Sequence, residues 1–388
     1  MSHLMNTYGR LSIAFKRGEG VWLWDDQGKR YLDALAGIAV NTLGHAHPRL
    51  VKAIADQAGR LLHASNLYRI NEQEALRDKL AQISGMDASF FCNSGCEANE
   101  AAIKLARLYG HNKGVELPSI IVMDQSFHGR TLATLSATGN KKVQKGFEPL
   151  VPGFVRVPFN DIAAVRDAAA RDKSIVAVLV EPIQGEGGIR STTAQFLKDL
   201  RSICDEFGLL LFYDEIHTGF GRTGRMWGYE WSGVKPDVAA IAKGMGGGFP
   251  IGAFMATEKA AVGMVPGTHG STYGGNPLAT GVANAVLDEL LKPGFIDAVA
   301  SKGEYLKGQL EALVKKHPKV YAEQRGMGFL QGLQCTPSVP AGDMVNKLQS
   351  LGMLVPPAGE NVVRIFPALI DRKSTRLNSS HVKRSRMP

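Results

Sequence analysis

The chain has few cysteines and no long apolar run, and both absences restrict what kind of protein it is. Its four cysteines, among 388 residues, are too scattered for a disulfide framework, and none lies in a C-x-x-C pair. We therefore expect reduced thiols. No apolar run approaches the ~20 residues that cross a bilayer, and the first residues lack the layout of a secretion signal. We expect a cytoplasmic protein with no membrane partner.

The chain also lacks a basic stripe within its folded part, although its formal charge is +9. Residues 371–388 hold six Lys or Arg and one Asp, a balance of +5, which leaves 39 basic and 35 acidic residues, a balance of +4, in the rest. A nucleic-acid-binding domain would concentrate its basic residues on a folded face. We expect no nucleic-acid partner, and we interpret residues 371–388 as a disordered, artefactual basic tail.

Short apolar segments alternate with helix-forming stretches through most of the chain. Buried strands are predicted at 89–93, 119–123, 174–182, 209–215 and 238–242, with helices at 97–109 and 193–207 between them. Such alternation favours right-handed crossovers and a mainly parallel sheet, which binds ligands at the carboxyl ends of its strands. Residues 20–33 predict a hairpin, and residues 295–370 predict a small α+β domain whose strands are 327–335 and 361–366.

The stretch from Val238 to Gly252 places a lysine at the end of a buried strand. Lys243 follows the apolar run, and glycines at 244, 246, 247 and 248 let the backbone come close to a ligand. An amine shielded at the mouth of a sheet has a lowered pKa and attacks carbonyl groups. A solvated lysine beside a flexible glycine run has the same pattern, so this stretch alone does not decide.

Two further features follow strands. Ser94, Gly95 and Cys96 lie between a strand and a helix, where free backbone amides and a glycine form a phosphate site. Asp214 ends an apolar strand, and a buried acid needs a cationic partner such as a protonated ring nitrogen. An ordinary strand-turn-helix and a simple cap would explain each feature by itself.

Two loops complete the set. SFHGRT, residues 126–131, supplies an aromatic ring, a glycine and an arginine suited to a carboxylate, although a surface ion pair would explain the arginine too. HGSTYGGNP, residues 269–277, offers hydroxyl groups for a phosphate or forms a plain turn. A phosphate site, a stacking ring, a pyridinium partner and an amine are together what pyridoxal phosphate requires.

With these motifs in order, the chain resembles the class III, fold-type I aminotransferases, and among them the acetylornithine aminotransferases, from about residue 6 to residue 370. The resemblance implies pyridoxal 5'-phosphate and an α/β fold in which a mainly parallel seven-stranded sheet is flanked by helices and joined by a small α+β domain. It implies an N-terminal segment, 1–45, that packs with the small domain, 291–370, and a cofactor-binding large domain, 46–290.

The resemblance also assigns cofactor contacts. Lys243 would hold the cofactor and move the substrate proton, and Asp214 would keep the pyridine nitrogen protonated. Phe127 and Ile216 would enclose the ring. Thr272 would reach the phosphate from a partner subunit, which makes a homodimer a functional need. The other predicted cofactor contacts are Gly95, Cys96, Glu215 and His217.

The same resemblance assigns substrate contacts. Arg130 would bind the substrate α-carboxylate with Ser271 beside it. Glu186 and Arg364 match a pair that closes while the amino donor is bound and opens for 2-oxoglutarate. The implied reaction moves the δ-amino group of N2-acetylornithine to 2-oxoglutarate, giving glutamate by a ping-pong route. No metal is expected, because His45 and His47 lack a third ligand.

Two departures and several alternatives stay open. His217 stands where the family usually has Gln, and Cys96 replaces a commoner small residue, with little effect expected. Ile38 stands where free-ornithine transaminases carry Tyr, which favours an acylated amine. GABA and putrescine have no α-carboxylate, so Arg130 counts against transaminases of these amines. Succinyldiaminopimelate has the same acylated amino-acid end as N2-acetylornithine and stays an alternative substrate. A non-catalytic or nucleic-acid-binding role is disfavoured, because Lys243 and Asp214 are both present.

Overall fold

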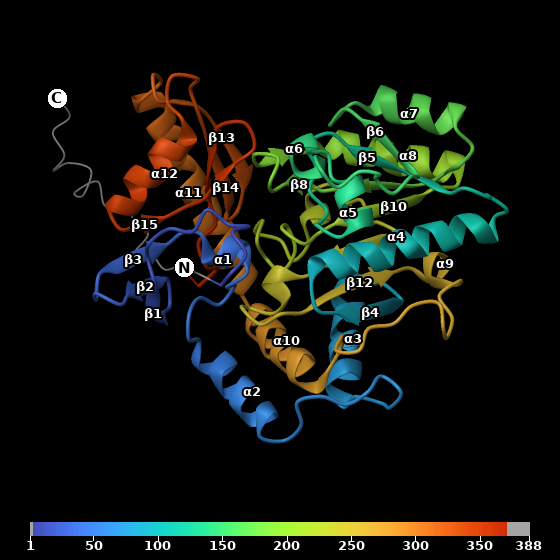
Figure 1. The fold of residues 1–388 in the computed structure, drawn as a ribbon, viewed down its shortest axis with the longest axis horizontal. Helices are drawn as coiled ribbons and strands as arrows, with labels where there is room; N and C mark the ends of the chain where they lie inside the picture. The colour runs from blue at the N-terminus through green and yellow to red at the C-terminus, as the bar shows by residue number, and fades with distance from the viewer. Residues whose placement is uncertain (1–2, 371–388) are drawn as a thin grey trace.

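The computed structural model describes residues 3–370, so the tail at 371–388 lies outside the described residues. A seven-stranded sheet, the main sheet, organises the fold (Figure 1). All its pairings are parallel except the two made by β12, which lies antiparallel between β4 and β11. The strands, in sheet order, are β4 (Ala88–Cys92), β12 (Gly252–Ala256), β11 (Val238–Ile241), β10 (Leu210–Asp214), β7 (Ile175–Val180), β5 (Ser119–Met123) and β6 (Phe154–Val157). The predicted mainly parallel seven-stranded sheet is confirmed.

Both faces of the main sheet are covered, which explains its continuous apolar strands. In β10, Leu211 and Tyr213 belong to one core cluster, and Leu210 and Phe212 belong to the cluster on the other face. The second face packs on α4 (Gly95–Asn112). The first face packs on α3 (Asn71–Ser84), α7 (Ile162–Arg171), α8 (Ala194–Phe207) and α10 (Pro277–Leu290).

A second, antiparallel sheet lies in the C-terminal part, beside the N-terminal strands (Figure 1). Its order is β13 (Tyr321–Met327), β14 (Leu330–Cys335), β17 (Val362–Ile365) and β16 (Pro357–Ala358), with α11 (Phe295–Lys316) and α12 (Ala341–Ser350) packed on it. The predicted strand 327–335 is therefore wrong at its start. Gly328 and Phe329 turn the chain between two strands, and Gly328 has a φ of 57°.

The N-terminal strands pair with the C-terminal part. The hairpin predicted at 20–33 is confirmed as β2 (Trp22–Asp25) and β3 (Arg30–Asp33), and β1 (Phe15–Glu19) extends it. On its other side β3 pairs in parallel with β15 (Met353–Leu354).

The proposed domain boundaries stay a prediction. The remaining elements are α1 (Ala36–Ala39), α2 (Pro48–Ala58), α5 (Leu132–Ala137), α6 (Lys141–Gln144), β8 (Ile183–Gln184), β9 (Arg190–Ser191), η1 (Gly228–Trp231), η2 (Lys243–Met245) and α9 (Glu258–Ala261).

Residues 36–39 form a left-handed turn, which is rare for L-amino acids. Their φ angles are 46°, 63°, 67° and 61°, and only the second residue is glycine. Each non-glycine residue in this conformation costs about 1–2 kcal/mol. Asp33 holds the turn in place, because its Oδ1 accepts hydrogen bonds from the N–H groups of Leu35 and Ala36, at 3.0 and 2.8 Å. The turn leaves Ile38 exposed.

Between residues 3 and 370 no helix is both long and apolar enough to cross a membrane.

Candidate active site

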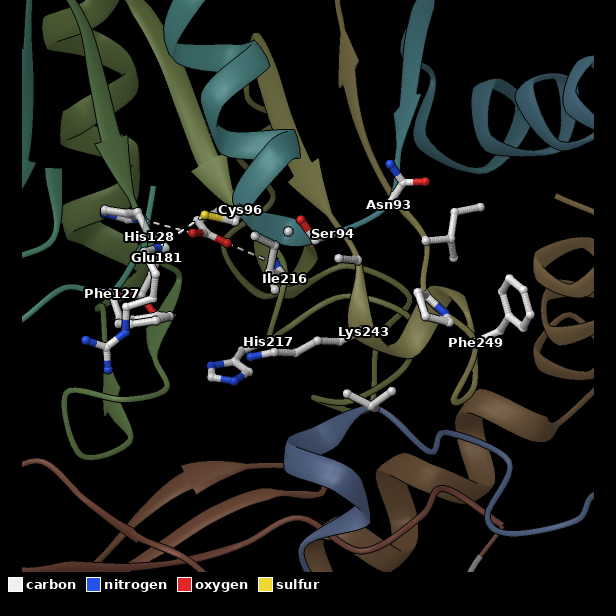
Figure 2. A pocket seen from close by; sticks show the side chains of 18 of the residues that line it. Asn93, Ser94, Cys96, Phe127, His128, Glu181, Ile216, His217, Lys243 and Phe249 are labelled. Carbon is white, nitrogen blue, oxygen red and sulfur yellow. Dashed lines mark hydrogen bonds and ion pairs between the residues drawn. The ribbon is translucent and has the colours of Figure 1, made fainter. Parts of the chain in front are cut away.

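A pocket of about 360 Å³ opens at the carboxyl ends of the main-sheet strands. Segments that follow β4, β5, β7, β10 and β11 supply most of its wall, as the parallel arrangement predicts. Figure 2 shows their side chains around one space. The wall consists of Val40, Asn93, Ser94, Gly95, Cys96, Phe127, His128, Gly129, Arg130, Glu181, Asp214, Ile216, His217, Ala242, Lys243, Gly248, Phe249, Pro250 and Ile251.

Asp214 is buried at the end of β10 with its carboxylate fixed by three donors. Its Oδ2 accepts from Asn99 Nδ2 at 2.8 Å and is bonded to His128 Nδ1 at 2.9 Å, and its Oδ1 accepts from the Ile216 N–H at 3.1 Å. Three hydrogen bonds of this kind fix the orientation of the carboxyl group. The arrangement holds the two Asp214 oxygens at one fixed place in the pocket wall.

Lys243 follows β11 in a strained backbone conformation, with a φ of 43°. Burial lowers the pKa of its amine to about 8, while the negative charges of Glu186 and Asp214 act in the opposite direction. Its side chain extends across the pocket toward His217 (Figure 2). A backbone strained at the reactive residue is typical of a functional site. The amine is thus partly neutral near pH 7, as a nucleophile requires.

The N-terminus of α4 forms a cradle for an anion. Ser94 caps the helix, because its hydroxyl accepts from the Glu97 N–H at 3.2 Å. Gly95 and Cys96 are the first two helical residues, so their N–H groups have no partner in a preceding turn. A Cβ on Gly95 would lie 2.7 Å from Cδ1 of Ile216, so only glycine lets the helix start against that side chain.

One face of α4 also holds the loop at 126–131. The Sγ of Cys96 accepts from the N–H groups of Arg130 and Thr131, at 3.2 and 3.3 Å, and Asn99 Nδ2 donates to the His128 carbonyl at 2.8 Å. The Cys96 thiol therefore connects the cradle with the arginine loop, a contact that sequence reasoning missed. Within the loop, the Arg130 guanidinium lies 5.5 Å from the centre of the Phe127 ring.

His217 is buried in the pocket wall in its neutral form. Burial, followed by the nearby charges of Lys243, Arg364 and Arg222, lowers its pKa well below the usual value. Its Nε2 is buried with no hydrogen-bond partner in the described part of the chain. The ring packs against Gly185, where a Cβ would lie 1.7 Å from Nδ1. The imidazole thus presents an unsatisfied nitrogen beside the lysine.

Glu186 and Arg364 form the ion pair that the resemblance implies. The Arg364 Nη1 lies 2.6 Å from the Glu186 Oε1. Neither residue belongs to the wall of the pocket, but the charges of both affect the pKa of Lys243. The pair therefore lies close to the amine.

Besides Glu186 and Arg364, the structure places three further predicted residues away from the pocket wall of this chain. The Glu215 carboxylate faces away and accepts from the N–H groups of Gly228 and Tyr229, both at 2.9 Å. Ser271 contacts the wall from outside, because its Oγ lies 3.4 Å from Nδ2 of the wall residue Asn93. Thr272 beside it is exposed.

Sequence reasoning missed Glu181, His128 and Asn99. Glu181 follows β7 directly, so its position at a strand end was the available signal, yet a glutamate before a proline has many ordinary explanations. His128 lay inside the 126–131 motif but was not assigned a contact. Asn99 lies on α4, one turn beyond the cradle, and only the packing of α4 on the sheet brings it to Asp214.

The chain belongs to the class-III aminotransferases, because the model of the family described as Aminotransferase class-III matches residues 4–377. The main sheet with its small antiparallel companion is the fold-type I architecture of these enzymes, and pyridoxal 5'-phosphate is their cofactor. Both expectations are confirmed.

Particular relatives are similar over nearly their whole length. The acetylornithine aminotransferase of Nitrosomonas europaea is 51% identical over 374 residues, which cover 96% of this chain and 94% of that protein. The solved ornithine aminotransferase of Toxoplasma gondii ME49 has a TM-score of 0.94 and 31% identity, covering 98% of this chain and 93% of that one. The solved acetylornithine aminotransferase of Elizabethkingia anophelis has a TM-score of 0.85 and 32% identity, covering 98% and 94%.

The pocket residues fit this cofactor. The cradle at Gly95 and Cys96 suits a phosphate, and the fixed Asp214 carboxylate suits a protonated ring nitrogen. The partnerless His217 Nε2 suits a polar ring substituent, and the Lys243 amine suits an aldehyde. Among residues 3–370 there is no group of three or more His, Cys, Asp or Glu arranged to hold a metal ion.

Proposed function

We propose that the protein is an acetylornithine aminotransferase, which transfers the δ-amino group of N2-acetyl-L-ornithine to 2-oxoglutarate. The observation that carries the proposal is the 51% identity to the Nitrosomonas europaea acetylornithine aminotransferase across 96% of the chain. The solved ornithine aminotransferase superposes well but is only 31% identical, so its similarity supports the fold more than the substrate. We place the enzyme in arginine biosynthesis on the same ground, and its cytoplasmic location stays a prediction.

Four side chains carry the proposed chemistry on the cofactor side. Pyridoxal phosphate supplies an aldehyde that condenses with amines and a ring that takes up electrons from the substrate carbon. Lys243 Nζ would hold the cofactor and would take up and return the substrate proton, which its lowered pKa favours. Asp214 keeps the ring nitrogen protonated. Phe127 and Ile216 enclose the ring and exclude water from it.

Four side chains carry the proposed substrate recognition. Arg130 is exposed beside the Phe127 ring, where its guanidinium suits an α-carboxylate. Arg364 binds the second carboxylate of 2-oxoglutarate once its ion pair with Glu186 has opened. Ile38, exposed on the left-handed turn, favours the acylated amine over a charged one. Ser271, which contacts the wall residue Asn93, completes the substrate site.

We further propose a homodimer in which Thr272 reaches the partner's phosphate site. Three large apolar side chains lie exposed near the Thr272 loop, with Leu67 at 87%, Tyr68 at 72% and Tyr273 at 62% exposure. Asn66 ties the two segments together, because its Nδ2 donates to the Ser271 and Gly274 carbonyls at 3.0 and 2.9 Å. An apolar patch of this kind marks a protein interface. Sedimentation equilibrium tests it, and a stable holo-monomer with full activity would contradict it.

The substrate is tested by comparing half-reactions of the holoenzyme with N2-acetylornithine, ornithine, GABA and succinyldiaminopimelate. We expect the acylated amines to react with the highest kcat/KM, and Ile38→Tyr to shift the preference toward free ornithine. A wild-type preference for ornithine would overturn the proposal. Equal rates with succinyldiaminopimelate would widen the substrate class to both acylated amino acids.

The role of Lys243 is tested by reduction with borohydride followed by peptide mass spectrometry. We expect the cofactor to be fixed to the peptide that contains Lys243 in the wild-type protein and no fixation in Lys243→Ala. A fixed cofactor in the variant would contradict the assignment.

A further inference from the structure

Glu181 is a buried acid whose two oxygens bind two different loops of the pocket. Its side chain is 3% exposed at the end of β7. Its Oε1 accepts from the Phe127 N–H at 2.9 Å, and its Oε2 accepts from the Gly185 N–H at 3.1 Å. No strand pairing joins residues 126–131 to residues 183–188 in the described part of the chain, so the Glu181 side chain connects two separate segments.

The two loops carry opposite parts of the proposed site. The first, at 126–131, carries the Phe127 ring and Arg130. The second, at 183–188, carries Glu186 and the glycine against which the His217 ring packs. A carboxylate that holds both backbones therefore sets the spacing between the ring face of the pocket and the edge beside Lys243.

Glu181 is buried next to a second acid, Asp214, and this arrangement costs free energy. In the sheet Val180 pairs with Tyr213, so Glu181 comes to lie beside Asp214. Burial and the Asp214 charge raise the pKa of Glu181 well above its usual value, whereas the two backbone N–H groups and the Lys243 amine act against that rise. A second buried acid next to a fixed carboxylate is costly unless its two acceptor oxygens are needed.

We propose that Glu181 is a positioning residue of the aminotransferase reaction, which ties the 126–131 loop to the 183–188 loop and so fixes the width of the pocket. The kinetic consequence of this role rests on the function proposed above. The mechanical consequence, that both loops loosen together when the carboxylate is lost, does not.

Hydrogen–deuterium exchange of the apoprotein tests the mechanical consequence. In Glu181→Gln one acceptor oxygen becomes an NH2 group that faces a donor, so one bond fails, and in Glu181→Ala both fail. We expect exchange to rise about tenfold or more in peptides from both loops of Glu181→Ala, and to stay unchanged in β7 and β10. Faster exchange in only one loop, or in neither, would overturn the proposal.

Kinetics of the holoenzyme test the positioning role. We expect Glu181→Gln to raise KM for both substrates about tenfold while kcat changes less than about threefold, since no reacting group is removed. Asp237→Asn is the control, because Asp237 is a buried acid at the amino ends of β10 and β11, where it accepts from the Leu211 N–H at 2.8 Å and pairs with Arg201 at 2.8 Å. The same KM change in the control would show that the loss of any buried acid has this effect through general stability, and it would overturn the proposal.

A second variant covers the case in which Glu181→Gln does not fold. Glu181→Asp keeps the carboxyl group but is one methylene shorter, so its carboxyl oxygens lose at least one of the two donors. We expect faster loop exchange and a raised KM in this variant as well, and wild-type behaviour in both measurements would overturn the proposal. If no aminotransferase activity is found in the wild-type protein, the exchange experiment still decides the mechanical part.

Discussion

Arg364 and Glu186 form an ion pair of 2.6 Å in which the two partners have very different exposure. The arginine side chain is 4% exposed and the glutamate side chain 34%. Glu186 can turn toward solvent at little cost, whereas the guanidinium has no such route and its Nε has no partner among the described residues. Any opening of the pair is therefore a movement of the glutamate, and it leaves a buried positive charge that attracts an anion.

Glu186→Gln removes the charge that neutralises Arg364. We expect KM for 2-oxoglutarate to fall several-fold and KM for the acetylated donor to rise, because the uncompensated guanidinium favours an anionic substrate. The two half-reactions, measured separately by stopped-flow absorbance, give both values. Glu323→Gln serves as the control, since Glu323 pairs with Arg325 in β13 and is half exposed. Equal changes in both KM values would contradict the prediction.

Lys243 gives cofactor uptake a defined pH dependence. Its pKa is lowered to about 8, so the amine is charged and unreactive well below that pH and neutral above it. We expect the rate at which apoenzyme takes up pyridoxal phosphate to rise with pH up to about 8 and then level off, with a difference on the order of a hundredfold between pH 6 and the plateau. Absorbance of the bound cofactor follows the rate. A flat profile from pH 6 to 9 would contradict the lowered pKa.

Gly185→Ala tests the packing of His217. The new methyl group would collide with the imidazole, and overpacking of this kind typically costs about 1–3 kcal/mol. We expect the free energy of unfolding to fall by about that amount, and His217→Ala in the same chain to recover most of it. Urea unfolding of the apoprotein measures both. Gly342→Ala in α12 is the control, because no atom lies within 4 Å of its Cβ position. If His217→Ala does not restore the free energy of unfolding of Gly185→Ala, the strain does not lie between these two residues.

Glu215 makes stability depend on pH. Burial raises its pKa from 4.5 to about 7, while its hydrogen bonds act against the rise. The folded state therefore binds this proton more tightly than the unfolded state. Its contribution to stability is fully present below pH 4.5 and is lost as the pH rises to about 7, by up to about 3 kcal/mol. We expect Glu215→Gln to lose this dependence, so that its stability relative to wild type improves over that pH range in urea titrations. If the difference in free energy of unfolding between Glu215→Gln and wild type stays constant from pH 5 to 8, the prediction is contradicted.

Features that repeat a local rule could be predicted from the sequence, and features that depend on packing could not. The strand ends at Asp214 and Lys243 were predicted because each residue follows an apolar run of five residues, which indicates a buried strand. β12 was missed because its Gly-Ala-Phe-Met-Ala pattern follows a glycine run that looked like loop alone. The left-handed turn was missed too, since one glycine among four residues gives no local signal and the turn depends on Asp33.

The wall of the pocket begins at Val40 and ends at Ile251, so it joins segments more than two hundred residues apart. A molecule that fills the pocket touches the ends of five strands and binds only the folded chain. By mass action, free cofactor at a hundred times its dissociation constant adds about 2.7 kcal/mol to the free energy of unfolding. We therefore expect the holoprotein to resist proteolysis longer than the apoprotein, because bound cofactor lowers the population of unfolded chain that a protease can cleave.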